Sequence, residues 1–216
     1  MLVRDCMTRN PITIPLDTPV HVALRLMKDK KVRRLPVLDS RGNLTGIVSE
    51  SDLLKVSPSA ATTLSMWELP ELLAKILVEK VMTRSVITVA EDTPLEEAAR
   101  IMADNRIGGL PVMDGQSLTG IITETDLFKV FLTQLGARRP GVRVTVVVPN
   151  IIGLLARVTH AISTAGGDIV GLGLGEVAGA SGNHWEMTFK VQDISREKLV
   201  ETLSPVVEKI VDVREV

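Results

Sequence analysis

The sequence has little cysteine, few aromatic side chains and no long uninterrupted apolar run. Its single cysteine, Cys6, excludes an internal disulfide and a metal site built from several cysteines. Two tryptophans, three phenylalanines and no tyrosine are too few rings for a stacking platform on single-stranded nucleic acid. The most apolar stretch, 144–155, is interrupted by Pro149, Asn150 and Gly153, and so falls short of the roughly 20 apolar residues of a membrane span.

An excess of one charge is also missing. The 25 lysines and arginines nearly balance the 26 acidic residues, so no overall field attracts nucleic acid or an anionic membrane. No apolar stretch follows Arg4 and Arg9, and we therefore expect no secretory signal. A hydrophobic content of 45% is enough for packed cores. These features predict a soluble, cytoplasmic protein with no nucleic-acid or membrane partner.

Common catalytic and metal-binding motifs do not occur either. There is no phosphate-binding loop with a lysine and no Gly-x-Ser-x-Gly nucleophile turn. The three histidines are scattered, without a cysteine or carboxylate at ligand spacing; they are His21, His160 and His184. The glycines at 171, 173 and 175 lack the spacing of a dinucleotide-binding fingerprint. We therefore expect no catalytic residue and no metal site.

What the sequence does contain is an internal repeat. Cys6-Met7-Thr8 recurs as Val81-Met82-Thr83, and Gly46-Ile47-Val48-Ser49-Glu50-Ser51-Asp52-Leu53 recurs as Gly120-Ile121-Ile122-Thr123-Glu124-Thr125-Asp126-Leu127. The offset is 75 residues at the start and 74 at the end, because one residue is lost in the turn at Gly115-Gln116. A repeat of this length predicts two copies of one structural unit with related pockets.

The sequence pattern of each repeat predicts the element order β-α-β-β-α. In the first, we expect a strand at 12–14, Thr18 as the cap of a helix that begins at Pro19, strands at 32–38 and 44–49, and a helix at 50–56. In the second, Thr93 to Glu96 predicts a capping box. The repeated methionines are expected in the core; they are Met7, Met27, Met82 and Met102. The domains predicted are repeat 1 (1–57), a linker with an apolar helix (58–77), repeat 2 (78–135), a linker (136–141) and a final domain (142–216).

The final domain follows a different pattern. Valines alternate from 142 to 148 as in a strand, and apolar residues from 154 to 162 lie on one helical face. A hairpin at 168–174 and 184–191, a helix opened by Ser195 and a last strand at 206–213 complete the order β-α-β-β-α-β. This order is typical of a ferredoxin-like split βαβ fold.

Each repeat places a hydroxyl and a carboxylate three residues apart where a strand gives way to a helix. The pairs are Ser49 with Asp52 and Thr123 with Asp126. The pattern alone is typical of a capping box, which satisfies the free N–H groups of the helix start. The same atoms can bind a nucleotide, because a helix start attracts phosphate and an aspartate can accept both hydroxyls of a ribose. Because the pair recurs with its whole surrounding frame, we favour binding.

Residues 2–132 resemble a tandem pair of CBS domains, a Bateman module. The resemblance is carried by Met7-Thr8, Thr18-Pro19, Leu35-Pro36-Val37 and Gly46 to Asp52, with their counterparts in the second repeat. It implies pseudo-two-fold symmetry and two clefts whose ligand, rather than cofactor, is AMP, ADP or ATP, with S-adenosylmethionine as a further candidate. It assigns one cleft to Ile121, Thr123 and Asp126 with Thr18, Ala23, Val32 and Arg34. It assigns the other to Ile47, Ser49 and Asp52 with Thr93, Ala98, Ile107 and Gly109.

The repeats differ where Arg33-Arg34 of the first corresponds to Gly108-Gly109 of the second. The fork of an arginine suits phosphate, and basic residues at this place contact phosphate in some members of the family that the chain resembles. The alternative is a solvated strand edge. The difference predicts unequal clefts, with the more phosphate-rich ligand near the arginines.

Residues 142–216 resemble an ACT domain through the strand 142–148, the turn from Pro149 to Leu155, and Gly166-Gly167-Asp168-Ile169. Asn150 stands where the family typically has aspartate, and Asp168 where it has asparagine. The resemblance implies a homodimer paired through sheet edges, with an effector, often an amino acid, at the interface. The residues implied there are Asn150, Ile152, Gly153, Leu154, Gly167 and Asp168. The alternative is a dimerisation module without a ligand.

The order CBS–CBS–ACT in a short chain resembles the acetoin-utilisation-protein family of bacteria. The expected fold combines α/β and α+β parts, a CBS pair followed by a ferredoxin-like ACT domain. The expected function is that of a non-catalytic regulatory homodimer that senses an adenine nucleotide and controls an unidentified protein. The alternatives are an oligomerisation scaffold with vestigial clefts and an enzyme acting on an adenosine compound, for which the sequence offers neither a base nor a metal.

Overall fold

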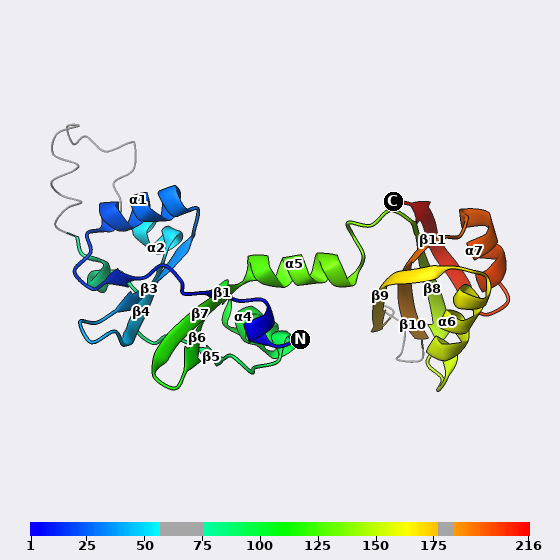
Figure 1. Cartoon of the computed structure of the whole chain (residues 1–216), viewed down its shortest axis with the longest axis horizontal. Helices are drawn as coiled ribbons and strands as arrows, with labels where there is room; N and C mark the ends of the chain where they lie inside the picture. Colours follow the sequence, from blue (N-terminus) through cyan, green and yellow to red (C-terminus); the bar gives the residue numbers. More distant parts are fainter. Residues whose placement is uncertain (57–75, 177–183) are drawn as a thin grey trace. The chain divides into compact units, whose positions relative to one another are not determined.

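The computed structural model describes residues 1–56, 76–176 and 184–216. Within them the chain forms two compact units, Met1–Leu127 and Phe128–Val216, which are described separately (Figure 1). The apolar helix predicted in the 58–77 linker lies, for the most part, outside the described residues. None of the helices in these three ranges has the length and apolar character needed to cross a membrane.

The first repeat forms a three-stranded sheet with two helices, in the order that the sequence predicts. Its elements are β2 (Ile14–Pro15), α1 (Val20–Lys30), β3 (Arg34–Leu38), β4 (Leu44–Ser49) and α2 (Glu50–Lys55). β2 runs parallel to β3, and β3 runs antiparallel to β4. Val20, Ala23 and Met27 of α1 are buried at helical spacing and belong to the same core as the alternate strand residues Leu35 and Val37.

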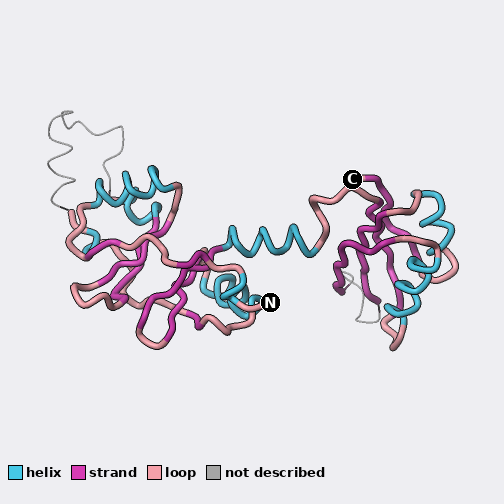
Figure 2. The backbone as a smooth tube through the Cα atoms, in the orientation of Figure 1, coloured by secondary structure: helices cyan, strands magenta, loops and turns pink. Residues whose placement is uncertain are grey.

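The second repeat has the same elements in the same order, as the internal repeat predicts (Figure 2). They are β5 (Val89–Ala90), α4 (Leu95–Asn105), β6 (Gly109–Asp114), β7 (Ser117–Thr123) and α5 (Glu124–Gln134). Again the first two strands are parallel and the last two antiparallel. The registers also agree, because Arg34 pairs with Ser49 and Gly109 pairs with Thr123.

Each repeat also receives the segment that precedes the other repeat in the sequence. The short strand β1 (Thr8–Arg9) pairs with β7 of the second repeat, and the N–H of Val3 in η1 (Val3–Asp5) donates to the carbonyl of Thr93 at 2.9 Å. In return, the N–H of Val78 in η2 (Val78–Lys80) donates to the carbonyl of Thr18 at 2.8 Å. Residues 76–83 therefore lie on the first repeat, and residues 2–9 on the second.

The repeated methionines fit into glycine positions across this exchange. The sulfur of Met82 occupies the space that a side chain on Gly46 would take, and the sulfur of Met7 does the same at Gly120. Met82 is 8% exposed and Met7 is 9% exposed. The prediction that Met7, Met27, Met82 and Met102 are core residues is confirmed, since all four are buried. The Met-Thr motif at the start of one repeat thus packs against the Gly-Ile motif of the other repeat.

The predicted helix caps at Thr18 and Thr93 are wrong. Both helices begin one residue later, with Pro19 and Pro94 as the capping residues and no side-chain bond to the helix start. The hydroxyl of Thr18 instead donates to the carbonyl of Pro15 at 2.8 Å, and the hydroxyl of Thr93 accepts the N–H of Ala90 at 3.1 Å. Each threonine therefore closes the turn that follows the preceding strand, because that turn brings main-chain partners nearer than the helix does.

The second unit is a four-stranded antiparallel sheet with helices α6 and α7 on one face (Figure 1). Its elements are β8 (Val142–Pro149), α6 (Leu154–Thr164), β9 (Asp168–Glu176), β10 (His184–Gln192), α7 (Arg196–Leu203) and β11 (Lys209–Glu215), in the sheet order β11-β8-β10-β9. The alternate valines of β8 are buried with the apolar faces of both helices. The last strand begins three residues later than predicted, because the N–H groups of Val206 and Val207 bond back to Leu203.

Candidate functional site

The serine and aspartate of the first repeat lie at the junction of β4 and α2. The hydroxyl of Ser49 donates to Oδ2 of Asp52 at 2.6 Å, and the same oxygen accepts the N–H of Ser49 at 3.0 Å. The N–H of Asp52 donates to the hydroxyl of Ser49 at 3.2 Å, which completes a capping box. Lys55 lies 3.7 Å from the other oxygen, Oδ1, of Asp52. This carboxylate is partly exposed, so a ligand can reach it.

The threonine and aspartate of the second repeat have the same geometry at the junction of β7 and α5. The hydroxyl of Thr123 donates to Oδ2 of Asp126 at 2.7 Å, and the N–H of Thr123 donates to the same oxygen at 3.1 Å. Asp126 is only 9% exposed, whereas Asp52 is more accessible. The capping box is thus complete in the first repeat, and in the second the carboxylate of Asp126 accepts the corresponding bonds from the hydroxyl and N–H of Thr123.

The two arginines of the first repeat reach across to the second. Arg33 donates from Nη2 to the hydroxyl of Thr125 at 3.3 Å. The guanidinium of Arg34 lies against Gly108, and its Cδ would be 3.2 Å from a side chain on Gly109. The space left by the two glycines of repeat 2 is thus occupied by an arginine of repeat 1. The arginine of one repeat and the glycines at the corresponding place in the other therefore contact each other.

Burial lowers the pKa of Arg34 below its usual value, and the nearby carboxylates of Glu124 and Asp52 oppose this effect. Arg34 remains a cation even so, because a guanidinium is not deprotonated in proteins. Sequence reasoning missed Glu124 and Thr125 as partners of the arginines. Both lie inside the repeated Gly-Ile motif beside Thr123 and Asp126, so the repeat itself could have pointed to them.

The six residues implied for an effector in the final domain fall into two separate turns. Asn150, Ile152, Gly153 and Leu154 lie where α6 begins, and Gly167 and Asp168 lie where it has ended. An 11-residue helix separates the two turns by about 16 Å. Gly153 has a left-handed φ of +86°, and a side chain on Gly167 would collide with Val191 and Ile162. One copy of this domain therefore does not bring the six residues together.

Neither the cysteine nor the histidines show the surroundings of a reactive group. Burial raises the pKa of the Cys6 thiol, and Asp5 raises it further, so the neutral thiol is favoured near pH 7. His184 lies 2.9 Å from a carboxylate oxygen of Glu208. In the part of the chain that the structure describes, no three histidine, cysteine or acidic side chains are grouped to hold a metal ion.

Comparison with known families decides the identity of the first unit. Residues 3–59 and 78–133 match the model of the CBS domain. The chain belongs to the CBS domain family. Its two repeats form a tandem CBS pair, and the duplicated hydroxyl and carboxylate lie in corresponding positions of the two CBS domains.

Solved structures of CBS pairs are similar to this chain over about three fifths of its length. CBSX2 in complex with AMP is 32% identical with a TM-score of 0.53, and 64% of this chain and 99% of that one are covered. The AcuB protein of Vibrio cholerae is 32% identical with a TM-score of 0.52, covering 64% and 95%. The CBS domain pair of protein MJ0100, in complex with 5′-methylthioadenosine and S-adenosyl-L-methionine, is 28% identical with a TM-score of 0.51, covering 64% and 98%.

Within the CBS pair, the residues implied for the clefts differ in accessibility. Ala23 and Ala98 are fully buried in α1 and α4, and Thr18 and Ile121 are less than a tenth exposed. The partly exposed members are Val32, Arg34, Ile47, Ser49, Asp52, Thr93, Ile107 and Thr123. Those residues can contact a ligand without a rearrangement of the core, whereas the fully buried Ala23 and Ala98 can only shape the wall behind it.

Proposed function

We propose that the CBS pair is the sensing part of a non-catalytic regulatory protein and that its ligand is an adenine nucleotide, AMP, ADP or ATP. The observation that carries the proposal is the duplicated hydroxyl and carboxylate at the starts of α2 and α5, with Arg33 and Arg34 beside them. The AMP bound to CBSX2 and the adenosine compounds bound to the MJ0100 pair support an adenosine ligand.

The proposed roles follow from the chemistry of each group. Asp52 and Asp126 accept hydrogen bonds from the ribose hydroxyls, and Ser49 and Thr123 turn their single hydroxyl proton from the aspartate to a phosphate oxygen. A carboxylate has about four acceptor positions, so the capping bonds and a ribose can be accommodated together. Arg33 and Arg34 hold the phosphates of the more highly phosphorylated ligand, because guanidinium forks match phosphate oxygens.

Binding would change the contacts between the two CBS domains. Arg33 and Arg34 now contact Thr125, Gly108 and Glu124 of the second domain, and a phosphate would compete for the same donors. A ligand that prefers one setting of the domains shifts the population toward it. We propose that this shift is passed on to the final domain or to a regulated protein as a coupling free energy.

We propose that residues 142–216 form a ferredoxin-like ACT domain that makes the protein a homodimer. The element order and the sheet order β11-β8-β10-β9 support this assignment. The edge strand β9 carries Leu172 and Leu174, which are 37% and 50% exposed, and pairing with the same strand of a second copy would cover both. An amino-acid effector held by Asn150 and Asp168 would need turns from two copies. We also propose a cytoplasmic location.

Calorimetric titration of the whole chain with AMP, ADP, ATP and S-adenosylmethionine tests the sensor. Saturable binding of at least one adenine nucleotide is expected, with release of a different amount of heat for each cleft. Absence of binding by all four, in protein shown to be free of carried-over nucleotide, would overturn the proposal in favour of a scaffold. Turnover of ATP by the same protein would instead contradict a non-catalytic role.

A further inference from the structure

The open face of the C-terminal sheet, which is the face opposite α6 and α7, has a hollow of about 460 Å³. Its lining includes the three alternate glycines of the edge strand β9, which are Gly171, Gly173 and Gly175. Leu135 and Ala137 line one side. None of the six residues implied for an amino-acid effector lines it. The hollow is therefore distinct from the implied effector site.

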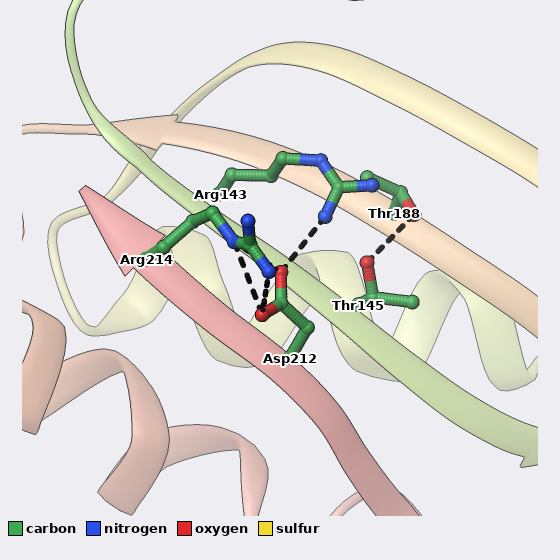
Figure 3. A network of polar contacts seen from close by, with 5 residues as sticks. All are labelled: Arg143, Thr145, Thr188, Asp212 and Arg214. Atoms are coloured by element: carbon green, nitrogen blue, oxygen red, sulfur yellow. Dashed lines mark hydrogen bonds and ion pairs between the residues drawn. The ribbon is translucent and has the colours of Figure 1, made fainter. Parts of the chain in front are cut away.

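The cations on this face already have partners of opposite charge. Asp212 accepts from Nη1 of Arg143 at 3.0 Å and from Nη2 of Arg214 at 2.6 Å (Figure 3). Lys190 donates to an oxygen of the terminal carboxyl group, on Val216, at 3.0 Å. Among the residues that the structure describes, the lining thus offers no free cation to an anionic ligand.

The charges at the rim that lack a partner are negative. Glu176 and Glu186 line the hollow, and both are exposed. Arg138 and Arg139, which directly follow the segment along one side of the hollow, are exposed as well. Within residues 1–56, 76–176 and 184–216, none of these four side chains forms an ion pair. Neighbouring segments therefore carry complementary charges that a single copy does not join.

Packing within one copy explains glycine at only one of the three positions. A side chain on Gly171 would collide with the main chain at Leu135. One on Gly173 would make only ordinary contacts, and one on Gly175 would meet nothing within 4 Å. Glycine inside a strand often marks a place where another group approaches closely. Gly173 and Gly175 thus leave space for a group that a single copy does not supply.

An apolar stripe on α5 leads to this hollow. Phe128, Phe131 and Leu135 lie at helical spacing, and the N–H of Leu135 bonds to the carbonyl of Phe131, so the three share one face. Phe128 is 66% exposed and Phe131 is 55% exposed, although the chain has only three phenylalanines. Leu135, the last member, lines the hollow. The stripe and the hollow are therefore adjacent, and both lack a covering partner in one copy.

The chain reaches the open face from the side of β9. The main chain at Leu135 passes over Gly171 of this edge strand, and Gly141 lies against Val191 of the neighbouring strand β10. The residues before Leu135 therefore approach from the outer side of β9. If two β9 strands pair, the α5 of each copy is brought over the open face of the other.

We propose that, in the homodimer, Phe131 and Leu135 of each copy fill the hollow of the other copy. This placement rests on the homodimer proposed above, in which two β9 strands lie side by side, and it adds the occupant of the hollow. The stripe from Phe128 to Leu135 is about 10 Å long, which spans two strand spacings of a sheet. It is thus long enough to cover the hollow over the second copy's β9 and β10.

One antiparallel register of the two β9 strands fits the glycines. With Gly173 of each copy at the two-fold axis, Gly171 of one copy faces Gly175 of the other. Leu135, which covers Gly171 of its own copy, then lies beside the open space at the second copy's Gly175.

The same register fits the exposed leucines and the charges. Leu172 of one copy faces Leu174 of the other, so both become covered. Glu176 faces Val170, and the turn at 136–139 packs on the main chain of Val170. The glutamate of one copy therefore comes close to the two arginines at 138 and 139 of the other.

Disulfide cross-linking of the whole chain tests the register. In a Cys6→Ser background, Gly173→Cys should give a covalent dimer on mild oxidation, because opposite residues of an antiparallel pair have Cα atoms about 4.5–5.5 Å apart. Leu172→Cys is the matched control and should cross-link far less, because its two copies lie on a diagonal about 7–8 Å apart. Absence of cross-linking by Gly173→Cys, in protein that sedimentation shows to be dimeric, would overturn the register.

Sedimentation of Phe131→Ser tests the occupant of the hollow. The residue is exposed in one copy, so the variant should fold, and the dissociation constant of the dimer should rise at least about tenfold. Val211→Ser, with a similar exposure on the opposite edge strand β11, should leave it unchanged. An unchanged dissociation constant for Phe131→Ser would refute this inference and leave the homodimer standing. Wild-type protein that stays monomeric at every concentration would refute both.

Discussion

The guanidinium of Arg34 lies over the backbone of Gly108, in the space that a side chain on residue 108 would take. Arg34 opens β3 of the first CBS domain and Gly108 immediately precedes β6 of the second, so the contact joins the two domains. Glu124 lies at the same place, and its Oε2 would be 2.6 Å from a side chain on residue 108. The glycine thus makes room for an arginine and a carboxylate of opposite charge at the domain boundary.

We expect Gly108→Ala to displace the Arg34 guanidinium and to weaken ATP binding by roughly threefold to tenfold, or about 0.7–1.4 kcal/mol. Both colliding groups are ends of flexible side chains, so the fold should tolerate the change. Calorimetry measures the affinity. In an Arg34→Ala background the same substitution should have almost no effect, because the two sites then no longer interact. Equal losses in both backgrounds would show that Arg34 is not involved.

The arginines should discriminate between ligands by their phosphates. Replacement of Arg33 and Arg34 by glutamine is expected to lower ATP affinity by about tenfold or more, since a hydrogen bond to a charged group contributes about 1.5–3 kcal/mol. AMP should lose less, and adenosine nothing. Arg41→Gln, in the exposed turn between β3 and β4, is the matched control. Equal losses for ATP and adenosine would indicate a general structural effect of the variant.

The capping boxes should contribute to stability independently of any ligand. Ser49→Ala removes a hydroxyl that accepts an N–H of the helix start, and Thr123→Ala removes a hydroxyl that donates to Asp126 in the first turn of α5. Each should lower the free energy of unfolding by about 1 kcal/mol. Urea denaturation of the ligand-free protein measures this. Ser51→Ala, an exposed position in the first turn of α2, should change it by less than about 0.5 kcal/mol. A similar cost at Ser51 would argue against the cap.

The exchange of segments between the CBS domains predicts coupling between Met82 and Gly46. Gly46→Ala should cost roughly 1–3 kcal/mol of stability, because its side chain would collide with the buried sulfur of Met82. In a Met82→Ala background the cost should be much smaller. Gly175→Ala, a strand glycine with open space, is the control for the loss of backbone freedom. Additive effects of the two substitutions would contradict the contact.

The proposed homodimer predicts which sheet edge can accept a charge. Leu174→Lys on β9 should shift the protein toward monomers in sedimentation experiments, because it places a cation in the proposed interface. Val211→Lys on β11 is the matched control, since Val211 and Leu174 are both 50% exposed and lie on opposite edges of the sheet. Dissociation by Val211→Lys alone would assign the dimer to the other edge.

The order of elements could be read from the sequence because each depends on local signals. Apolar spacing predicts α1, the internal repeat predicts α4 as its counterpart, and the alternating valines predict β8. The duplicated hydroxyl and carboxylate were likewise found from spacing alone, and the structure shows the bonds that the spacing implies.

Contacts between distant segments could not be read in this way. The pairing of Thr8 with Ile121 and of Thr83 with Ile47 depends on how the two repeats meet, and no local pattern contains that information. The same is true of Arg34 over Gly108. The caps expected at Thr18 and Thr93 failed for a related reason, because a hydroxyl near a helix start has competing partners in the turn before it.

The most direct test of the account is calorimetric titration of AMP into the wild-type protein and into the double variant Asp52→Asn, Asp126→Asn. Asparagine keeps an acceptor for the capping bonds but removes the charge that receives the ribose hydroxyls. Saturable binding to the wild type and a loss of about thirtyfold or more in the double variant, about 2 kcal/mol, is the predicted result. Equal affinity for AMP in both proteins would contradict the proposal that these two carboxylates bind the nucleotide.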